Sequence, residues 1–243
     1  MSKILLVFLV IVLLFVMYNV IIVEYQSYVE RTIGDKYENL VFGKLRKIRE
    51  LTIIRNVIMP SNDSPIGETE ADMICVSKKG IFTIECKYRK IKKDIYECTL
   101  YSSTWGPKLN QNSNFNMSNP FTQNNTHISA IKKIMDTISV NTDNIFNVVC
   151  LSCPFEFNLG DSILTSKKSK NFLFYPEFNN KILLRQDNSH NGVKVFAKTY
   201  SDLPDVYTDE EINNLISILN IYAADKEKRK NFSTDMYMYN HGM

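Results

Sequence analysis

Carboxylates and one lysine gather in two neighbouring apolar segments of the sequence. Glu85 and Lys87 close the segment GIFTIECK (residues 80–87), and Asp72 lies in the preceding segment, residues 70–77. Successive side chains of a β-strand point to opposite faces, so Glu85 and Lys87 share a face if this segment is a strand. A hairpin turn between the two segments would bring Asp72 toward that pair.

Such a group of side chains suits metal-assisted phosphoryl chemistry. Clustered carboxylates raise one another's pKa unless a cation lies among them, and oxygen ligands suit Mg²⁺ or Mn²⁺ rather than zinc. A bound ion can polarise a phosphoryl group and generate hydroxide from water, while a lysine stabilises charge in the transition state. Alone, however, a Glu-x-Lys pattern is more often a surface ion pair worth under about 1 kcal/mol.

The segments around this hairpin predict the elements that must position it. Tyr37, Val41, Leu45 and Ile48 recur at helical spacing, and Glu38 lies on the same predicted helix. Further patterns predict strands at residues 51–59, 95–101, 145–153 and 193–199, a long loop at 105–120, and helices at 121–139 and from Thr208 to about residue 228. This order predicts an α/β fold with a mixed central sheet flanked by helices and the hairpin at its centre.

An uncharged apolar stretch precedes this domain. Residues 4–23 are 20 residues with Asn19 as the only strongly polar one, enough to cross a hydrocarbon layer of roughly 30 Å. A cleaved signal peptide is the alternative, but the stretch is longer than the usual apolar region of such peptides and no small-residue cleavage pattern follows it. We therefore expect one N-terminal transmembrane helix in a lipid bilayer.

The remaining composition completes the predicted organisation. We divide the chain into an anchor (1–23), a linker (24–33), one domain (34–228) and a flexible tail (229–243). The number of cysteines, five, is odd, and Cys75 and Cys86 lie in apolar runs, which favours buried thiols in a reducing compartment and hence a cytoplasmic domain. A domain outside the cell is the alternative. The net charge of +3 does not by itself indicate nucleic acid, for which a local basic stripe suffices.

Several blocks of sequence together resemble a known family. They are GDKYE (residues 34–38), TEAD (69–72), GIFTIECK (80–87), Trp105 and NPFTQNNTHI (119–128). In this order they resemble the nuclease-related domain, NERD, of the PD-(D/E)XK nuclease superfamily, whose fold is restriction-endonuclease-like. The resemblance covers about residues 34–153.

The resemblance implies roles for individual residues. It implies that Asp72 and Glu85 are metal ligands, that Lys87 is the catalytic lysine, and that Glu38 reaches the metal directly or through water. Gln123 matches a glutamine of the family and is expected to act in catalysis by orienting the substrate or the nucleophilic water.

Two departures from the family pattern concern neighbouring positions. Met73 replaces a frequent histidine, but it should face away from Asp72. After Lys87 the residues are YRK, where the family more often has Asn followed by an aromatic residue, so we expect different substrate contacts there. Arg89 and Lys90 belong to a basic run that suits phosphate contacts, although a solvated strand end explains it equally well. His127 is a further candidate substrate contact, for which an ordinary histidine on a helix surface is the more common explanation.

The implied activity is hydrolysis of phosphodiester bonds in nucleic acid, with DNA expected, by a membrane-anchored enzyme that uses Mg²⁺ or Mn²⁺. The alternative is a non-catalytic nucleic-acid-binding or sensor module on the same fold. Such a module would have no chemical need for Asp72, Glu85, Lys87 and Glu38 together.

Overall fold

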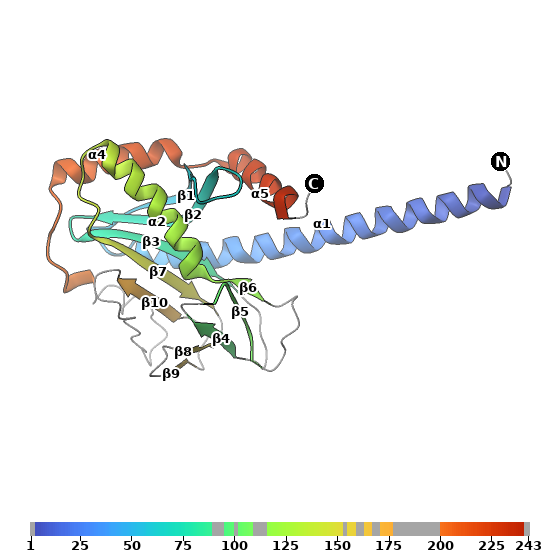
Figure 1. The fold of residues 1–243 in the computed structure, drawn as a ribbon, viewed down its shortest axis with the longest axis horizontal. Helices are drawn as coiled ribbons and strands as arrows, with labels where there is room; N and C mark the ends of the chain where they lie inside the picture. Colours follow the sequence, from blue (N-terminus) through green and yellow to red (C-terminus); the bar gives the residue numbers. More distant parts are fainter. Residues whose placement is uncertain are drawn as a thin grey trace.

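The computed structural model describes residues 3–88, 95–99, 102–108, 116–152, 155–158, 163–166, 171–176 and 200–240. These residues form a mixed α/β structure with two five-stranded sheets and flanking helices (Figure 1). The helices are α1 (Lys3–Leu45), α2 (Pro120–Thr137), α4 (Asp209–Tyr222) and α5 (Lys226–Asn240). The strands are β1 (Thr52–Pro60), β2 (Glu68–Ser77), β3 (Gly80–Lys87), β4 (Tyr96–Thr99), β5 (Thr104–Pro107), β6 (Met117–Ser118), β7 (Ile145–Leu151), β8 (Phe155–Asn158), β9 (Ile163–Ser166) and β10 (Asn171–Pro176).

The first sheet has the strand order β1-β2-β3-β7-β10 and places the predicted hairpin at its centre. The strands β2 and β3 are antiparallel, whereas β3 and β7 are parallel, with Ile81 opposite Ile145. Parallel neighbours need a long crossover, and here the connection contains α2. The predicted mixed central sheet flanked by helices is therefore confirmed.

The tight turn between β2 and β3 depends on Gly80. Its φ is +153°, and a Cβ added there would lie 2.5 Å from the ring of Phe146 and 3.1 Å from the carbonyl oxygen of Asn144. Only glycine avoids both the unfavourable backbone conformation and the contact. This residue thus allows β3 to leave the turn directly beside β7.

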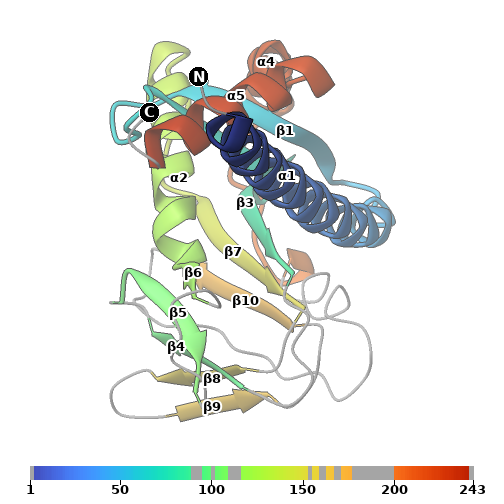
Figure 2. The ribbon, with the colours of Figure 1, turned by 90° about the vertical axis from the view of Figure 1, so that its right-hand side faces the viewer.

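Helices cover the two faces of this sheet from opposite sides (Figure 2). On one face the last turns of α1 pack through Tyr37, Val41 and Leu45 against a cluster that includes Met73 and Phe82. On the other face α2 and α4 cover a second cluster, built from Val57, Met59, Ala71, Ile74, Val76, Ile81, Ile128, Ile131, Ile134, Leu215 and Leu219. The sheet is therefore buried on both faces, and this close packing holds the strands that carry the site residues in place.

The alternation of side chains along β1 and β2 shifts by one residue at the level of Asp72. Ile54 and Val57 of β1, three positions apart, both pack in the cluster beneath α2, and so do Ala71 and Ile74 of β2. Regular alternation puts residues three apart on opposite faces, so each strand changes phase between these pairs, while the register between the two strands stays the same on both sides.

This shift separates residues that regular alternation along β2 would put on one face. Glu70, Asp72 and Ile74 are spaced two apart, but Ile74 lies in the core beneath α2, whereas Glu70 makes an ion pair with Arg229 of α5. Opposite Asp72 on β1, Asn56 has a φ of +53°, the left-handed conformation that asparagine tolerates better than most residues.

Several predicted segments have another secondary structure than expected. The helix α1 continues through residues 24–33, where we predicted a linker, and past Gly34. The predicted long loop contains β5 and β6, and the predicted tail contains α5. The predicted strand at 193–199 lies outside the described residues. The prediction at 121–139 is confirmed by α2, and Cys75 is a buried free thiol, as expected.

The predicted anchor has a separate outcome. Of the described residues, none belongs to a helix that is both long and apolar enough to cross a membrane. The N-terminal transmembrane helix of the predicted fold is therefore not confirmed.

Candidate active site

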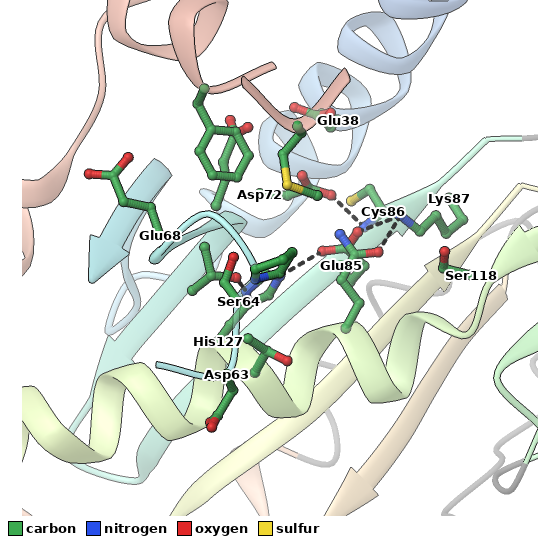
Figure 3. Close-up of a pocket in the computed structure, with 17 residues that line it drawn as sticks. Glu38, Asp63, Ser64, Glu68, Asp72, Glu85, Cys86, Lys87, Ser118 and His127 are labelled. Atoms are coloured by element: carbon green, nitrogen blue, oxygen red, sulfur yellow. Dashed lines mark hydrogen bonds and ion pairs between the residues drawn. The ribbon is translucent and has the colours of Figure 1, made fainter. Parts of the chain in front are cut away.

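A cavity of about 420 Å³ opens where β2 and β3 separate, and it contains most of the predicted site residues (Figure 3). The pairing of these two strands ends at Met73 and Ile84, so the next residues, Asp72 and Glu85, lie where the strands diverge, at the fork. The walls come from α1, β2, β3, α2, α5 and the loop after β1. Residues that line it are Glu38, Asp63, Ser64, Pro65, Glu68, Thr69, Glu70, Asp72, Glu85, Cys86, Lys87, Ser118, Gln123, Thr126, His127, Phe232 and Met236.

Lys87 joins the end of β3 to the start of α2. Its Nζ donates to Oε1 of Glu85 at 2.6 Å and to Oε1 of Gln123 at 2.8 Å. The structure thus brings together Glu85, Lys87 and Gln123, as predicted. The side chain of Lys87 keeps 20 % of its area exposed, so its ammonium group borders the cavity.

The helix α2 is fixed against the sheet by an amide network directly behind this group. Asn124 donates through Nδ2 to the carbonyl oxygens of Thr83 and Val148 and to Oδ1 of Asn147. Asn147 in turn donates to the carbonyl oxygen of Phe121. Because these amides are buried, the network fixes the position of the first turns of α2 and of the side chains they carry.

Asp72 is held at the fork by the backbone of β3. Its Oδ2 accepts a hydrogen bond from the backbone N–H of Cys86 at 2.7 Å. Burial raises the pKa of Asp72 well above its usual value, and the charges of Glu85 and Glu38 raise it further. Lys87 opposes this effect but does not cancel it. A cation beside Asp72 would favour its ionised form.

Glu85 has the opposite shift. Burial raises its pKa, but the charge of Lys87 and the hydrogen bonding and charge of His127 lower it by more, so the net pKa lies below the usual 4.5. The environments of Asp72 and Glu85 thus move the pKa values of two adjacent carboxyl groups apart. Such opposed shifts are a common property of functional sites.

His127 lies in the site and not on the helix surface, so the surface alternative is wrong. Its side chain is 2 % exposed, its Nδ1 lies 2.6 Å from Oγ1 of Thr69, and its Nε2 lies 3.4 Å from Oε2 of Glu85. Figure 3 shows His127 and Lys87 on opposite sides of the Glu85 carboxylate. Helical spacing indicates this position, because His127 follows Gln123 by four residues and thus shares its helical face.

Arg229 of α5 is the site residue that the sequence prediction missed. It makes an ion pair with Glu70, and its NH2 lies 3.5 Å from Oε2 of Glu38 while its NH1 lies 3.3 Å from Oδ1 of Asp35. Burial raises the pKa of Glu38 and of Glu70, and Arg229 lowers both in part. Glu38 therefore faces a guanidinium group as well as the cavity.

Two carboxyl groups at the fork could hold a divalent metal ion. Oε2 of Glu85 is buried without a hydrogen-bond partner, and the carboxyl group of Asp72 lies next to it. Among the residues that the structure describes, no group of three or more His, Cys, Asp or Glu side chains is arranged to hold a metal ion. Mg²⁺ commonly binds one or two carboxylates and keeps several waters, so this pair of carboxylates fits such an ion.

The other predicted contacts have a different outcome. Arg89 and Lys90 lie outside the described residues, so their predicted contact with substrate stays a prediction.

The comparisons with known proteins add one finding. The family model of the nuclease-related domain, NERD, matches residues 14–152, more than half of the 243-residue chain. The matched range includes every predicted site residue from Glu38 to His127, but not α5. No curated protein and no solved structure matches the chain.

Proposed function

The chain belongs to the nuclease-related domain family, whose general placement is the PD-(D/E)XK nuclease superfamily, and on this premise we propose that it is a divalent-metal-dependent nuclease. It would hydrolyse phosphodiester bonds in nucleic acid, with DNA as the expected substrate. The observation that carries the proposal is the position of Lys87, whose ammonium group contacts Glu85 and Gln123 beside the buried Asp72.

In this proposal Asp72 and Glu85 would hold Mg²⁺ or Mn²⁺. A bound ion of this kind polarises the phosphoryl group and lowers the pKa of bound water. Lys87 stabilises the negative charge that develops on the phosphoryl oxygens, and a preorganised cation in a partly buried site is effective at this task. Gln123 orients the ammonium group of Lys87 through its Oε1, which keeps the charge at the cavity and away from solvent.

A second candidate function is supported by Arg229. Its contacts with Glu38 and Glu70 place a cation of the protein itself next to the carboxylates. A nucleic-acid-binding or sensor module with little turnover could keep its acidic residues neutralised in this way. Retention of both the lysine and the paired carboxylates at one cavity favours the nuclease.

The proposal extends to the first helix, for which we propose insertion in a bilayer through residues 4–23 and a domain on the cytoplasmic side. Two observations support the insertion. The segment carries no charged residue, and Phe8 and Leu13 are each at least 60 % exposed. Figure 1 shows the N-terminal part of α1 extending away from the sheets, so these large apolar side chains are exposed on a protruding helix.

The direct test is incubation of the purified full chain with linear and plasmid DNA, single-stranded DNA and RNA. Each substrate is tested with Mg²⁺, with Mn²⁺ and with EDTA. The proposal predicts cleavage of at least one substrate that requires the metal and is lost in a Glu85→Gln variant. Binding without cleavage by the folded protein, under all metal conditions, would instead support the binding module.

A further inference from the structure

Two buried atoms in the cavity wall lack a hydrogen-bond partner and face one another. They are Nε2 of His127 and Oε2 of Glu85, which lie 3.4 Å apart on side chains that are each 2 % exposed. Both residues line the cavity. A buried polar atom without a partner destabilises the fold, so two such atoms side by side require an explanation.

The other nitrogen of His127 is already engaged. Its Nδ1 lies 2.6 Å from Oγ1 of Thr69, and both side chains are buried. When Nδ1 donates a hydrogen bond to this hydroxyl oxygen, Nε2 of the neutral imidazole is unprotonated. Its lone pair is then on the side of the ring that faces Oε2 of Glu85. Metal-binding histidines have this arrangement, in which a second polar group holds the nitrogen that does not bind the ion.

The separation of the two atoms fits ligands of one ion. Bonds from a divalent ion to nitrogen and oxygen are about 2.0–2.2 Å long, which puts two neighbouring ligands roughly 3.0–3.5 Å apart at octahedral to tetrahedral angles. The observed 3.4 Å lies in this range. An ion pair between a protonated His127 and Glu85 is the competing explanation, but their contact is long and neither atom has a hydrogen-bond partner of good geometry. A cation in front of them would give each a partner.

We propose that His127 is a metal ligand through Nε2 and that Glu85 Oε2 binds the same ion. Glu85 also belongs to the proposed carboxylate site, so the inference rests on the metal site of the proposed function and specifies its chemistry. Because no three His, Cys, Asp or Glu side chains of the described residues are arranged around one ion, His127 and Glu85 are its direct protein ligands and Asp72 reaches it through bound water. Imidazole suits transition metals better than Mg²⁺. The site therefore prefers Mn²⁺ or Co²⁺ to Mg²⁺, and waters or substrate phosphate oxygens complete the coordination.

The test measures ion binding and not only activity. Mn²⁺ and Mg²⁺ affinities of the purified full chain are determined by calorimetry, and a nitrogen ligand on bound Mn²⁺ is detected by pulsed electron paramagnetic resonance. The variants are His127→Gln, which removes the imidazole, and Thr69→Val, which keeps the imidazole but removes the hydroxyl that orients it. Thr126→Val is the matched control, since this threonine also lines the cavity.

In the wild type we expect a directly coordinated nitrogen and tighter binding of Mn²⁺ than of Mg²⁺. His127→Gln should abolish the nitrogen signal and weaken Mn²⁺ binding by more than Mg²⁺ binding. Thr69→Val should weaken Mn²⁺ binding by roughly 10–100-fold, the usual effect of removing such an orienting group, and Thr126→Val should not. Thermal unfolding without metal confirms that each variant is folded.

Two results would overturn the inference in distinguishable ways. If the wild type binds Mn²⁺ without a nitrogen ligand, or if both His127→Gln and Thr69→Val bind it like the wild type, His127 is not a ligand, while the carboxylate site stands. If the folded wild type binds neither ion, the inference and the metal dependence of the proposed function both fail.

Discussion

Asp72 and Glu85 lie side by side at the fork of β2 and β3, yet the pKa of one is raised and that of the other is lowered. The difference comes from their partners. Glu85 contacts Lys87 and lies near His127, whereas Asp72 has a backbone N–H and two repelling carboxylates as its neighbours. A protein without bound metal therefore carries a buried carboxyl group at Asp72 whose ionisation opposes folding.

The first prediction concerns this residue. An acid with a raised folded-state pKa stabilises the fold fully below its unfolded pKa, near 3.8 here, and loses that contribution as the pH rises through the folded-state pKa. Asp72→Asn keeps an acceptor for Cys86 and removes the charge. In EDTA at pH 7 we expect it to raise the free energy of unfolding by about 1–3 kcal/mol, the range found for poorly compensated buried polar groups.

Urea unfolding between pH 4 and pH 8 checks this prediction. The difference between Asp72→Asn and the wild type should shrink toward low pH, where the aspartate is protonated. Asp63→Asn, at an exposed residue of the same cavity rim, is the control and should change little. A destabilised Asp72→Asn protein at pH 7 would contradict the assigned direction of the pKa shift.

At the scale of elements, α5 joins the site to the end of the chain. Arg229 of α5 contacts Glu70, which is 159 positions away in sequence, and Phe232 and Met236 line the cavity. The helix is thus attached through a cluster of ion pairs and two side chains, without a continuous apolar stripe.

The second prediction tests this attachment. Arg229→Ala leaves Glu38 and Glu70 partly buried without their main cation. Exposed ion pairs contribute under about 1 kcal/mol, and breaking fully buried ones costs about 3–5 kcal/mol. The side chain of Arg229 is 25 % exposed, so we expect a loss of about 1–3 kcal/mol.

Urea unfolding at pH 7 measures this loss, with Lys230→Ala as the control because Lys230 is exposed on the same helix. Addition of divalent metal should reduce the effect of Arg229→Ala, since a cation can then neutralise the carboxylates. An unchanged stability would mean that the ion pairs of Arg229 do not hold α5 in place.

Local patterns were sufficient to predict the part of the site that lies on regular elements. The two-residue spacing of Glu85 and Lys87 follows from strand geometry alone, and the apolar stripe of α2 predicted the helix that carries Gln123. The shift of phase at Asp72 could not be predicted, because it depends on the pairing of β2 with β1. The contact of Arg229 is also tertiary, and α5 lacks the apolar period by which helices are recognised.

At the scale of the molecule, the family match and the site coincide. The match over residues 14–152 includes most of α1 and all of β1–β3, α2 and β7, the elements that position Glu38, Asp72, Glu85, Lys87 and Gln123. The helix α5 lies outside the matched range. Arg229 is therefore a contribution of this chain beyond the region that defines the family match.

The third prediction concerns the apolar start of the chain. If residues 4–23 insert in a bilayer, the full chain should remain in the membrane pellet after alkaline carbonate extraction. A variant with Leu13→Lys and Val16→Lys should be released, because each charge at the centre of a spanning helix costs about 2.5–3.5 kcal/mol. Recovery of the wild-type chain in the soluble fraction would contradict the proposed anchor, and protease treatment of intact cells would determine on which side the domain lies.

The central claim, that Lys87 serves metal-dependent phosphodiester hydrolysis, is tested most directly by comparing DNA cleavage rates of the wild type, Lys87→Ala and Lys47→Ala in Mn²⁺. Lys47 is exposed after α1 and lies outside the cavity, so its variant is the control. We predict a loss of about 10²–10³-fold for Lys87→Ala, the usual cost of removing one group that stabilises transition-state charge, and no loss for the control. Equal cleavage by wild type and Lys87→Ala, or no cleavage by any of the three folded proteins, would contradict the proposed nuclease.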